Sequence, residues 1–373
     1  MPIVAPRYLF VVSSSCQMYS GTGTAIFDWI RHCRDDFEFS FLMDNSATVN
    51  VAVTVAFCTK QKIPLHISSS LFLPGCPDTG PRSIALHLQQ HDYDFVECVS
   101  WASASTNLSV LSAKPPKPKL LFTPHSQPLN TLPDHNRYFM VTPVFSRMLH
   151  AADAVFIDSP SEKDHPEFGG VSSGTIHFIP LGVDTGHFMP SSRRNPYQLA
   201  CVCDCREPRK RLDFLLAAFS AAHRIEPRLR LILAGMGSDT VSVANVVSGA
   251  VTRLGYIARA ELLHLYQTVS AFVLISDYEA FGLPIAEALC CGTSVLLNEQ
   301  TALHELFGGL PGVNWTRNRD IAATAAKMVA LGGGNGDSET IAEAARSKFA
   351  FEKTYSKKRE IVLGLREQRS SVG

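Results

Sequence analysis

Short apolar runs alternate with amphipathic segments along the whole chain. In the first half, helices are predicted by segments such as GTAIFDWIRHCRD and GPRSIALHLQQH, and strands by the runs RYLFVVSS, FEFSFLM, LHISSSL, YDFVECVS, KLLFTPH and DAVFIDS. Strands that alternate with helices in this way are typical of a parallel sheet covered by helices. The pattern therefore predicts an α/β architecture.

The segment 176–198, IHFIPLGVDTGHFMPSSRRNPYQ, interrupts this alternation with glycine, proline and polar residues, and we interpret it as an interdomain link. The alternation then resumes, with predicted strands LACVCDC, LRLILAG, VTRLGYI, SAFVLIS and TSVLLNE and predicted helices over 211–225, 259–269, 283–291, 321–331 and 338–368. Two successive α/β units predict two doubly wound, Rossmann-like domains facing a cleft. Ligands of such sheets bind at the carboxyl ends of the strands.

Composition narrows the class of protein. The chain has 373 residues, enough for two domains, of which 46% are hydrophobic and 18% charged. Its 34 basic and 34 acidic residues give zero formal net charge, so nucleic acid is not expected as a partner. No apolar stretch approaches the roughly 18–20 residues that span a bilayer, and the first apolar run reads as a buried strand rather than a signal peptide. The expected location is cytoplasmic, with peripheral membrane contact left open.

Cysteine and aspartate patterns give no metal site. Ten cysteines are scattered along the chain, unlike the disulfide framework of a small secreted protein. Cys201, Cys203 and Cys205 have the period-two spacing that places residues on one face of a strand. No second Cys/His cluster at ligand spacing accompanies them, and the D-x-D pair Asp92 and Asp94 only introduces a predicted strand. We therefore expect no bound metal.

The stretch SDYEAFGLPIAEALCCGTSV predicts an anion site. Pro284 and Gly292 mark the start and the end of a short helix that follows a predicted strand. The N–H groups of Phe281, Gly282 and Leu283 then lie at the helix N-terminus, where unpaired donors and the helix dipole favour a diphosphate. The glycine also lets a ligand approach the backbone closely.

Glu279 and Glu287 stand eight positions apart around this turn. Glu287, one turn into the helix, is placed to hydrogen-bond a ribose diol, and Glu279 to reach a different hydroxyl-bearing group. An acid/base pair in a glycosidase-like hydrolase is the competing interpretation. The helix start between the two residues favours anion binding instead.

These residues carry a family resemblance. DYEAFGLPIAEALCCG resembles the E-x7-E motif of glycosyltransferase family 4, whose members are retaining enzymes with the GT-B fold. The segments IPLGVDTGHFMP, REPRKRLDFLLAAF, LRLILAGMGSD and RLGYIARAELLHLYQTVSAFVLIS are similar, in the same order, to the C-terminal domain of that family. The resemblance is continuous over roughly 176–300 and weaker over 1–175. It implies an acceptor-side domain over 1–182, a nucleotide-sugar-binding domain over 183–354, and a C-terminal helix, about 355–373, that packs back on the first domain.

The resemblance also implies which cations hold the donor. Members of the family place an Arg and a Lys against the donor diphosphate, where they stabilise the leaving group, and Arg206 and Lys210 match them. The interval between the two is one residue shorter than usual. Arg209 and Arg211 therefore compete with Arg206 for this role.

Further site residues follow from the resemblance. His125, at the end of the run KLLFTPH and just past its apolar strand, is expected near the donor sugar, which Glu279 also faces. The catalytic set is thus Glu279, His125, Arg206 and Lys210. The residues expected to bind the donor nucleotide are Gly21, Gly23, Gly235, Tyr256, Ile257, Phe281, Gly282, Leu283 and Glu287.

The implied activity is metal-independent, retaining transfer of a hexose from a UDP- or GDP-sugar to an acceptor hydroxyl on a glycan, glycoconjugate or small molecule. No cofactor is expected beyond the nucleotide-sugar substrate. Other reactions of the GT-B fold, by a sugar phosphorylase or a nucleotide-sugar epimerase, stay open, as does a catalytically silent nucleotide-sugar-binding protein. The sequence does not set the donor sugar, the base, the acceptor, the linkage or the oligomeric state.

Overall fold

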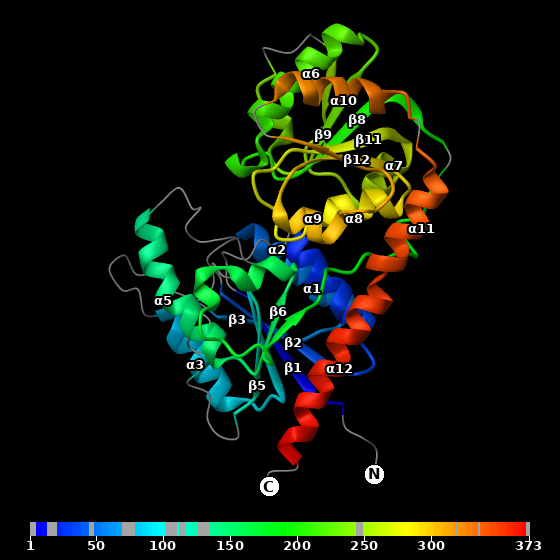
Figure 1. Ribbon diagram of the computed structural model, residues 1–373. Helices are drawn as coiled ribbons and strands as arrows, with labels where there is room; N and C mark the ends of the chain where they lie inside the picture. The colour runs from blue at the N-terminus through cyan, green and yellow to red at the C-terminus, as the bar shows by residue number, and fades with distance from the viewer. Residues whose placement is uncertain are drawn as a thin grey trace. The chain divides into compact units, whose positions relative to one another are not determined.

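The chain forms two compact units, Met1–Pro180 with Thr354–Gly373 and Leu181–Lys353 (Figure 1). The boundary between residues 180 and 181 falls inside the predicted link. The computed structural model describes residues 5–12, 21–44, 48–68, 79–100, 110–111, 117–125, 135–191, 193–243, 249–317, 320–334 and 336–370.

The first unit contains a seven-stranded sheet in the order β3-β2-β1-β4-β5-β6-β7, with every neighbouring pair parallel. Its strands are β1 (Arg7–Val12), β2 (Glu38–Asp44), β3 (Leu65–Ser68), β4 (Phe95–Val99), β5 (Lys119–Thr123), β6 (Ala154–Ile157) and β7 (Ile176–Phe178). Its helices are α1 (Gly21–His32), α2 (Thr48–Gln61), α3 (Thr79–Gln90), α5 (His135–Ala151), α12 (Phe351–Ser370, from Thr354 onward in this unit) and the short 3-10 helices η4 (Pro160–Asp164) and η5 (Pro166–Phe168).

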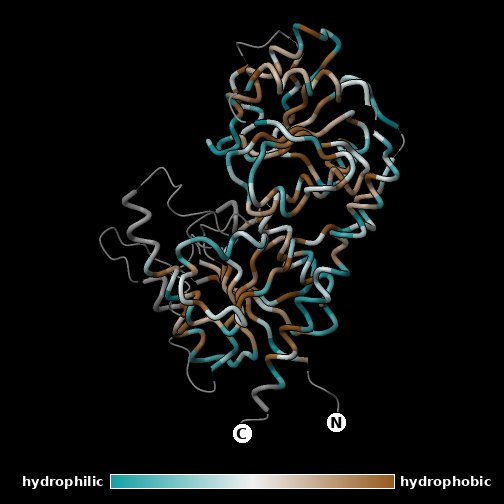
Figure 2. Tube along the Cα trace, in the orientation of Figure 1, coloured by the Kyte–Doolittle hydropathy of each residue, from teal (hydrophilic) through white to brown (hydrophobic). Residues whose placement is uncertain are grey.

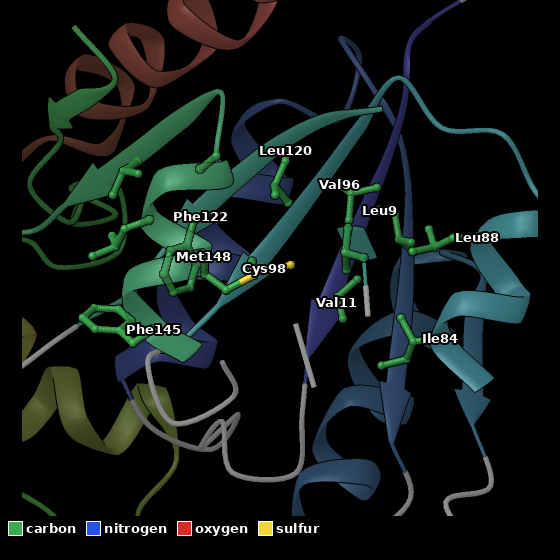
Figure 3. Packing of buried hydrophobic residues seen from close by; sticks show 14 of the residues in the cluster. Leu9, Val11, Ile84, Leu88, Val96, Cys98, Leu120, Phe122, Phe145 and Met148 are labelled. Carbon is green, nitrogen blue, oxygen red and sulfur yellow. The ribbon is translucent and has the colours of Figure 1, made fainter. Parts of the chain in front are cut away.

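Side chains of β1 alternate between two buried faces of this sheet. Leu9 and Val11 face a cluster with residues of α3 and α5, among them Leu88 and Phe145 (Figure 3). On the other face, Tyr8 lies 6.4 Å from Trp29 of α1, measured between ring centroids. Helices therefore cover both faces of the sheet, as in a doubly wound domain.

A buried ion pair holds α12 against the sheet of the first unit. The Lys358 ammonium lies 2.7 and 2.9 Å from the two carboxylate oxygens of Glu97 on β4. The hydroxyls of Tyr8 and Thr123 donate to the same carboxylate, and the Trp29 ring centroid is 4.8 Å from the ammonium. Both charges are nearly excluded from water, at 2% and 9% side-chain exposure, but each has several polar or aromatic partners.

The second unit contains a six-stranded parallel sheet in the order β10-β9-β8-β11-β12-β13. Its strands are β8 (Asn195–Val202), β9 (Arg230–Ala234), β10 (Val251–Arg253), β11 (Val269–Leu274), β12 (Ser294–Asn298) and β13 (Val313–Thr316). Its helices are α6 (Leu212–Ile225), α7 (Arg259–Thr268), α8 (Leu283–Cys290), α9 (Thr301–Phe307), α10 (Ile321–Gly332), α11 (Ser338–Phe349) and the 3-10 helices η6 (Pro208–Lys210) and η7 (Ser238–Thr240).

Helices cover both faces of this sheet as well. Figure 1 shows α6 and α10, which contact each other, on one face, and α7 and α8 on the other. Hydrophobic residues concentrate along the strands between these layers (Figure 2). The strand order reverses between β8 and β11, which makes their carboxyl ends the topological switch point of the unit.

The structure confirms the prediction of two doubly wound α/β domains and corrects several details. The predicted link is wrong at its ends, because β7 and the start of β8 extend the two sheets there. The strand expected through Cys205 ends at Val202. Gly21 and Gly23 lie in the first turn of α1, and residues 13–20 before them lie outside the described residues. Among the helices of the described residues, none is both long and apolar enough to span a bilayer.

Candidate functional site

Two turns lie side by side at the switch point of the second unit. One follows β8 and carries Arg209; the other follows β11 and carries Asp277 and Tyr278. The Asp277 N–H donates to the Arg209 carbonyl over 2.7 Å, and the Arg209 guanidinium donates to the Tyr278 carbonyl over 2.9 Å. Ligands of doubly wound sheets bind at this place in the fold.

Glu279 lies buried at the centre of these turns, only 6% exposed. Its carboxylate accepts from the Lys210 ammonium and the Ser276 hydroxyl, each over 2.5 Å, and lies 3.6 Å from the Arg209 guanidinium. Burial raises the pKa of Glu279, but the charges of Lys210 and Arg209 outweigh it, so the pKa is lowered below its ordinary value. The carboxylate is therefore ionised at neutral pH. That suits an acceptor of a hydroxyl proton better than a general acid, which needs a raised pKa.

The other cations of the β8–α6 turn have different partners. Arg206, half exposed, donates to Asp204 over 2.6 and 2.8 Å. Arg211 pairs with Asp213 and Asp277, each over 3.2 Å. Of the three arginines considered for the diphosphate, Arg209 is the one that the structure joins to Glu279.

The N-terminus of α8 opens beside Glu279. Gly282 caps the helix with a left-handed backbone, φ 85°, and its carbonyl accepts from the N–H groups of Ile285 and Ala286. The N–H groups of Gly282 and Leu283 precede these first helical hydrogen bonds, the place in a helix where backbone donors lack an intrahelical partner. Phe281 packs its ring against the core, so only its backbone is available to a ligand.

Gly282→Ala is expected to destabilise the second unit by about 1–3 kcal/mol, because an L-residue is strained at this φ. The added Cβ would also lie 2.6 Å from the Ile285 Cδ1 atom. Urea unfolding followed by circular dichroism measures the loss. Gly309→Ala is the matched control: it has φ 78° but nothing within 4 Å of the added Cβ. Equal losses in both variants would show that the contact with Ile285 costs nothing.

Glu287 has a separate environment from Glu279. It is 5% exposed and accepts from the Tyr266 hydroxyl of α7 over 3.2 Å. The two carboxylates of the motif thus have distinct polar partners, one cationic and one phenolic. Glu279 and Glu287 therefore do not share one environment.

A hydrogen bond connects the turn after β9 with the turn after β10, and the turn after β9 also packs against the turn between β8 and α6. The Gly235 N–H donates to the Gly255 carbonyl over 2.8 Å. A Cβ at Gly235, which has φ 107°, would lie 2.1 Å from the Cys203 carbonyl oxygen, so no other residue fits this close approach. Next along the chain, the Tyr256 side chain is 64% exposed, and Ile257 packs against a small apolar cluster.

His125 belongs to the first unit and follows β5. Its Nδ1 lies 2.6 Å from an Asp158 carboxylate oxygen, and both side chains are nearly buried. Glu162 holds Asp158 in place by accepting its N–H over 2.9 Å. Burial lowers the pKa of His125, but the charge and hydrogen bond of Asp158 outweigh it, so the pKa is raised above its ordinary value. The sequence prediction missed Asp158.

Asp158→Asn is expected to lower the pKa of His125, because it removes the charge that opposes burial. The raised pKa also makes this pair contribute stability below the pKa of an unfolded histidine, and that contribution is lost as the pH rises through the folded-state value. NMR titration of the imidazole signals measures the shift. The other histidines in the same spectrum serve as the reference, and an unchanged His125 signal would contradict the role of Asp158.

Within the ranges that the structure describes, no group of three or more His, Cys, Asp or Glu side chains is arranged to hold a metal ion. Asp92 and Asp94 precede β4, where Asp94 accepts from the Arg7 N–H over 2.9 Å.

Two family models match the chain. The model described as Glycosyltransferase Family 4 matches residues 24–187, and the model described as Glycosyl transferases group 1 matches residues 196–332. Together they cover most of both units.

Curated relatives match shorter parts. O-antigen chain mannosyltransferase B of Escherichia coli is 39% identical over 110 residues, which are 27% of this chain and 29% of that protein. MMP alpha-(1->4)-mannosyltransferase of Mycolicibacterium hassiacum is 28% identical over 156 residues, 41% of this chain and 38% of that protein. The chain thus spans less than half the length of these relatives.

Solved structures match over nearly the whole chain. Anabaena Alr3699/HepE in complex with UDP and glucose has a TM-score of 0.77 at 16% identity and covers 96% of this chain and 100% of its own. TarM has a TM-score of 0.79 at 10% identity, over 97% of this chain and 99% of its own. At this identity the likeness concerns the fold alone: two units, each with a parallel α/β sheet, as in GT-B glycosyltransferases. With both family models and the fold in agreement, the chain belongs to glycosyltransferase family 4.

Proposed function

We propose that this protein is a retaining glycosyltransferase that transfers a hexose from a UDP- or GDP-sugar to an acceptor hydroxyl in glycan or glycoconjugate synthesis. The observation that carries the proposal is the buried Lys210–Glu279 pair beside the N-terminus of α8. There a cation and a carboxylate lie beside the first N–H groups of a helix, at the switch point where doubly wound sheets bind ligands. The family membership and the mannosyltransferases among the matched relatives support it.

Each group has a proposed task in binding the donor. Lys210, Arg206 and the N–H groups of Gly282 and Leu283 bind the diphosphate, and Glu287 binds the ribose diol. Glu279 accepts from a hydroxyl of the transferred sugar, and on the family resemblance we assign His125 to that sugar as well. The turn with Gly235, Tyr256 and Ile257 lines the nucleotide. Gly21 and Gly23, at the start of α1, keep their proposed role near the phosphate.

Donor binding would exchange the partners of the Lys210–Glu279 pair. Without donor the two charges neutralise each other. With donor bound, the ammonium would bind the diphosphate and the carboxylate would accept a hydrogen bond from a sugar hydroxyl, so each group keeps a polar partner. As the glycosidic bond breaks, negative charge grows on the leaving diphosphate, where a fixed cation stabilises it most.

Arg206 and Arg209 compete for the second cationic position. Arg209 is tied to the next turn by two hydrogen bonds through its carbonyl and guanidinium, which suits a positioning residue. Arg206 is bound to Asp204 at the surface, a partner that a diphosphate can replace. We therefore assign Arg206 to the diphosphate. Isothermal titration with UDP and GDP tests this: Arg206→Ala should weaken binding more than Arg209→Ala, and the reverse order would move the assignment.

The proposed activity is tested with a panel of nucleotide sugars, by measuring released UDP or GDP with and without a chelator. Release in the presence of chelator, dependent on an added acceptor, is the expected result. Absence of release together with absence of a nucleotide-induced thermal shift would overturn the proposal. Release that requires inorganic phosphate would identify a phosphorylase, and isomerised donor without release would identify an epimerase.

A further inference from the structure

Three sulfur atoms lie in a row directly before the cations of the β8–α6 turn. The Sγ atoms of Cys201 and Cys203 are 3.9 Å apart, and those of Cys203 and Cys205 are also 3.9 Å apart. Cys201 is 1% exposed, Cys203 is 8% exposed and Cys205 is half-buried. None of the three has a task in the proposed transfer reaction.

The backbone distinguishes the two possible pairs. Cys201 lies within β8, paired in register with Leu233 of β9, so its position is fixed by the sheet. Cys203 and Cys205 lie beyond the end of β8, and their N–H groups donate to the carbonyls of Ala234 and Met236 over 3.1 and 2.8 Å. The turn that contains Cys205 can adjust without breaking a strand. Cys205 is also the thiol that solvent reaches most readily.

We propose that Cys203 and Cys205 form an oxidation site, where a hydroperoxide converts the two thiols into a disulfide next to the Lys210–Glu279 pair. Forming the bond requires the sulfur atoms to approach from 3.9 Å to about 2.05 Å. A disulfide within so short a loop is strained and easily reduced, as expected of a reversible modification rather than a structural bridge.

The central position of Cys203 makes it the attacking thiol. Hydrogen bonds from the thiols of Cys201 and Cys205 lower its pKa, and the Lys210 charge adds to this, whereas burial and the Glu279 charge oppose it. The same arrangement raises the pKa of both flanking thiols. A thiolate flanked by thiol donors and a cation is the form that reacts with peroxides.

The reaction is balanced with a peroxide as the only added reactant. The Cys203 thiolate attacks one oxygen of hydrogen peroxide, the O–O bond breaks, and the departing hydroxide takes a proton to leave as water, which gives a sulfenic acid. The Cys205 thiol then loses its proton and attacks the Cys203 sulfur; the S–O bond breaks, and hydroxide leaves as a second water. The two sulfurs are oxidised by two electrons in total, and the peroxide oxygens are reduced.

The disulfide would change the neighbouring site through the backbone. The Cys203 carbonyl packs against Gly235, and the chain continues from Cys205 directly into Arg206, whose side chain packs against Gly237. A shift of Cys205 therefore moves the cation that we assign to the diphosphate. We expect oxidation to weaken nucleotide binding about tenfold or more, the loss expected when one charge-assisted hydrogen bond to the diphosphate is broken. This second effect rests on the proposed function.

The modification itself is tested on the full chain with hydrogen peroxide, by mass spectrometry of the peptide that contains all three cysteines. We expect loss of two hydrogen atoms in wild type, reversed by dithiothreitol, and the same loss in Cys201→Ser, the matched control. Cys203→Ser and Cys205→Ser should not form the bond. A disulfide that persists in Cys205→Ser and disappears in Cys201→Ser would overturn the assigned pair. Oxidation only to sulfinic acid in wild type would overturn the site.

The effect on the neighbouring site is tested by isothermal titration of reduced, oxidised and Cys205→Ser protein with UDP and GDP. The expected result is weaker binding by the oxidised wild type alone, restored by dithiothreitol. Equal binding by reduced and oxidised wild type would overturn the coupling and leave the transferase proposal standing. Absence of nucleotide binding in every form would instead contradict the proposed function, whereas the mass result would stand by itself.

Discussion

Lys210→Ala is expected to lower the turnover of the best nucleotide-sugar donor by about 10²–10³-fold, the loss typical of removing one group that stabilises a developing negative charge. The ammonium lies 2.5 Å from Glu279 and is only 11% exposed, so little water is present to replace it. Its loss also leaves the buried carboxylate with Arg209, 3.6 Å away, as its remaining cationic partner. The measurement is the initial rate of UDP or GDP release at saturating donor and acceptor.

Arg211→Ala provides the matched comparison, because it removes an adjacent cation that pairs with Asp213 and Asp277 instead. We expect its rate to stay within about threefold of wild type, as for a partly exposed surface pair. Thermal unfolding of both variants separates loss of chemistry from loss of fold. Equal rates for Lys210→Ala and wild type would remove Lys210 from the site.

Glu97→Ala is expected to destabilise the first unit by about 3–5 kcal/mol, because it leaves the Lys358 ammonium buried without its acidic partner. Tyr8 and Thr123 lose their shared acceptor in the same change. Hydrogen exchange measured by mass spectrometry locates the effect. The amide hydrogens of β4 and α12 peptides should exchange faster than in wild type, whereas those of the second unit should exchange at the wild-type rate.

A double variant separates the energy of the charge pair from that of the packing. Glu97→Leu with Lys358→Met replaces both charges with apolar groups, and we expect it to recover most of the stability lost in Glu97→Ala. A double variant as unstable as Glu97→Ala would show that the hydrogen bonds from Tyr8 and Thr123 to Glu97, rather than its charge pairing with Lys358, supply the lost stability.

The order of strands and helices could be predicted from the sequence because most strands contain a short apolar run between polar turns. The missed elements lack that signal. Strand β7, with the sequence IHF, is only half-buried, and β13 carries the polar residue Asn314. Both are strands because a neighbouring strand pairs with them, which is a long-range effect that local pattern does not record.

The sequence names candidate residues for the site but does not show which of them are in contact. Lys210 and Glu279 were recognised from separate motifs, but their pairing depends on β8 and β11 becoming neighbours in the sheet. Asp158 was missed although a signal existed. His125 and Asp158 follow β5 and β6, which pair in parallel, so their side chains end at the same edge. A carboxylate just past a buried strand is therefore as strong a signal of a site as a histidine there.

The cysteine pattern shows a limit of periodicity. Period-two spacing led to the prediction of a strand through Cys205, yet β8 ends at Val202 and a turn follows. The three sulfurs still meet because the Cys203 and Cys205 N–H groups continue to donate to the chain that leaves β9. Period-two spacing alone does not distinguish a continuous strand from a strand followed by a turn whose N–H groups still bond to the neighbouring chain.

The Glu97–Lys358 pair also bears on the order in which the two units complete their folds during translation. The two residues are 261 positions apart, so at about 5–20 residues per second the carboxylate precedes its ammonium by on the order of 10–50 seconds. The second unit is one continuous stretch of chain, and all of it is translated within that interval. The unit translated first therefore completes its fold last, and the Glu97 carboxylate on β4 lacks its ammonium partner until α12 emerges.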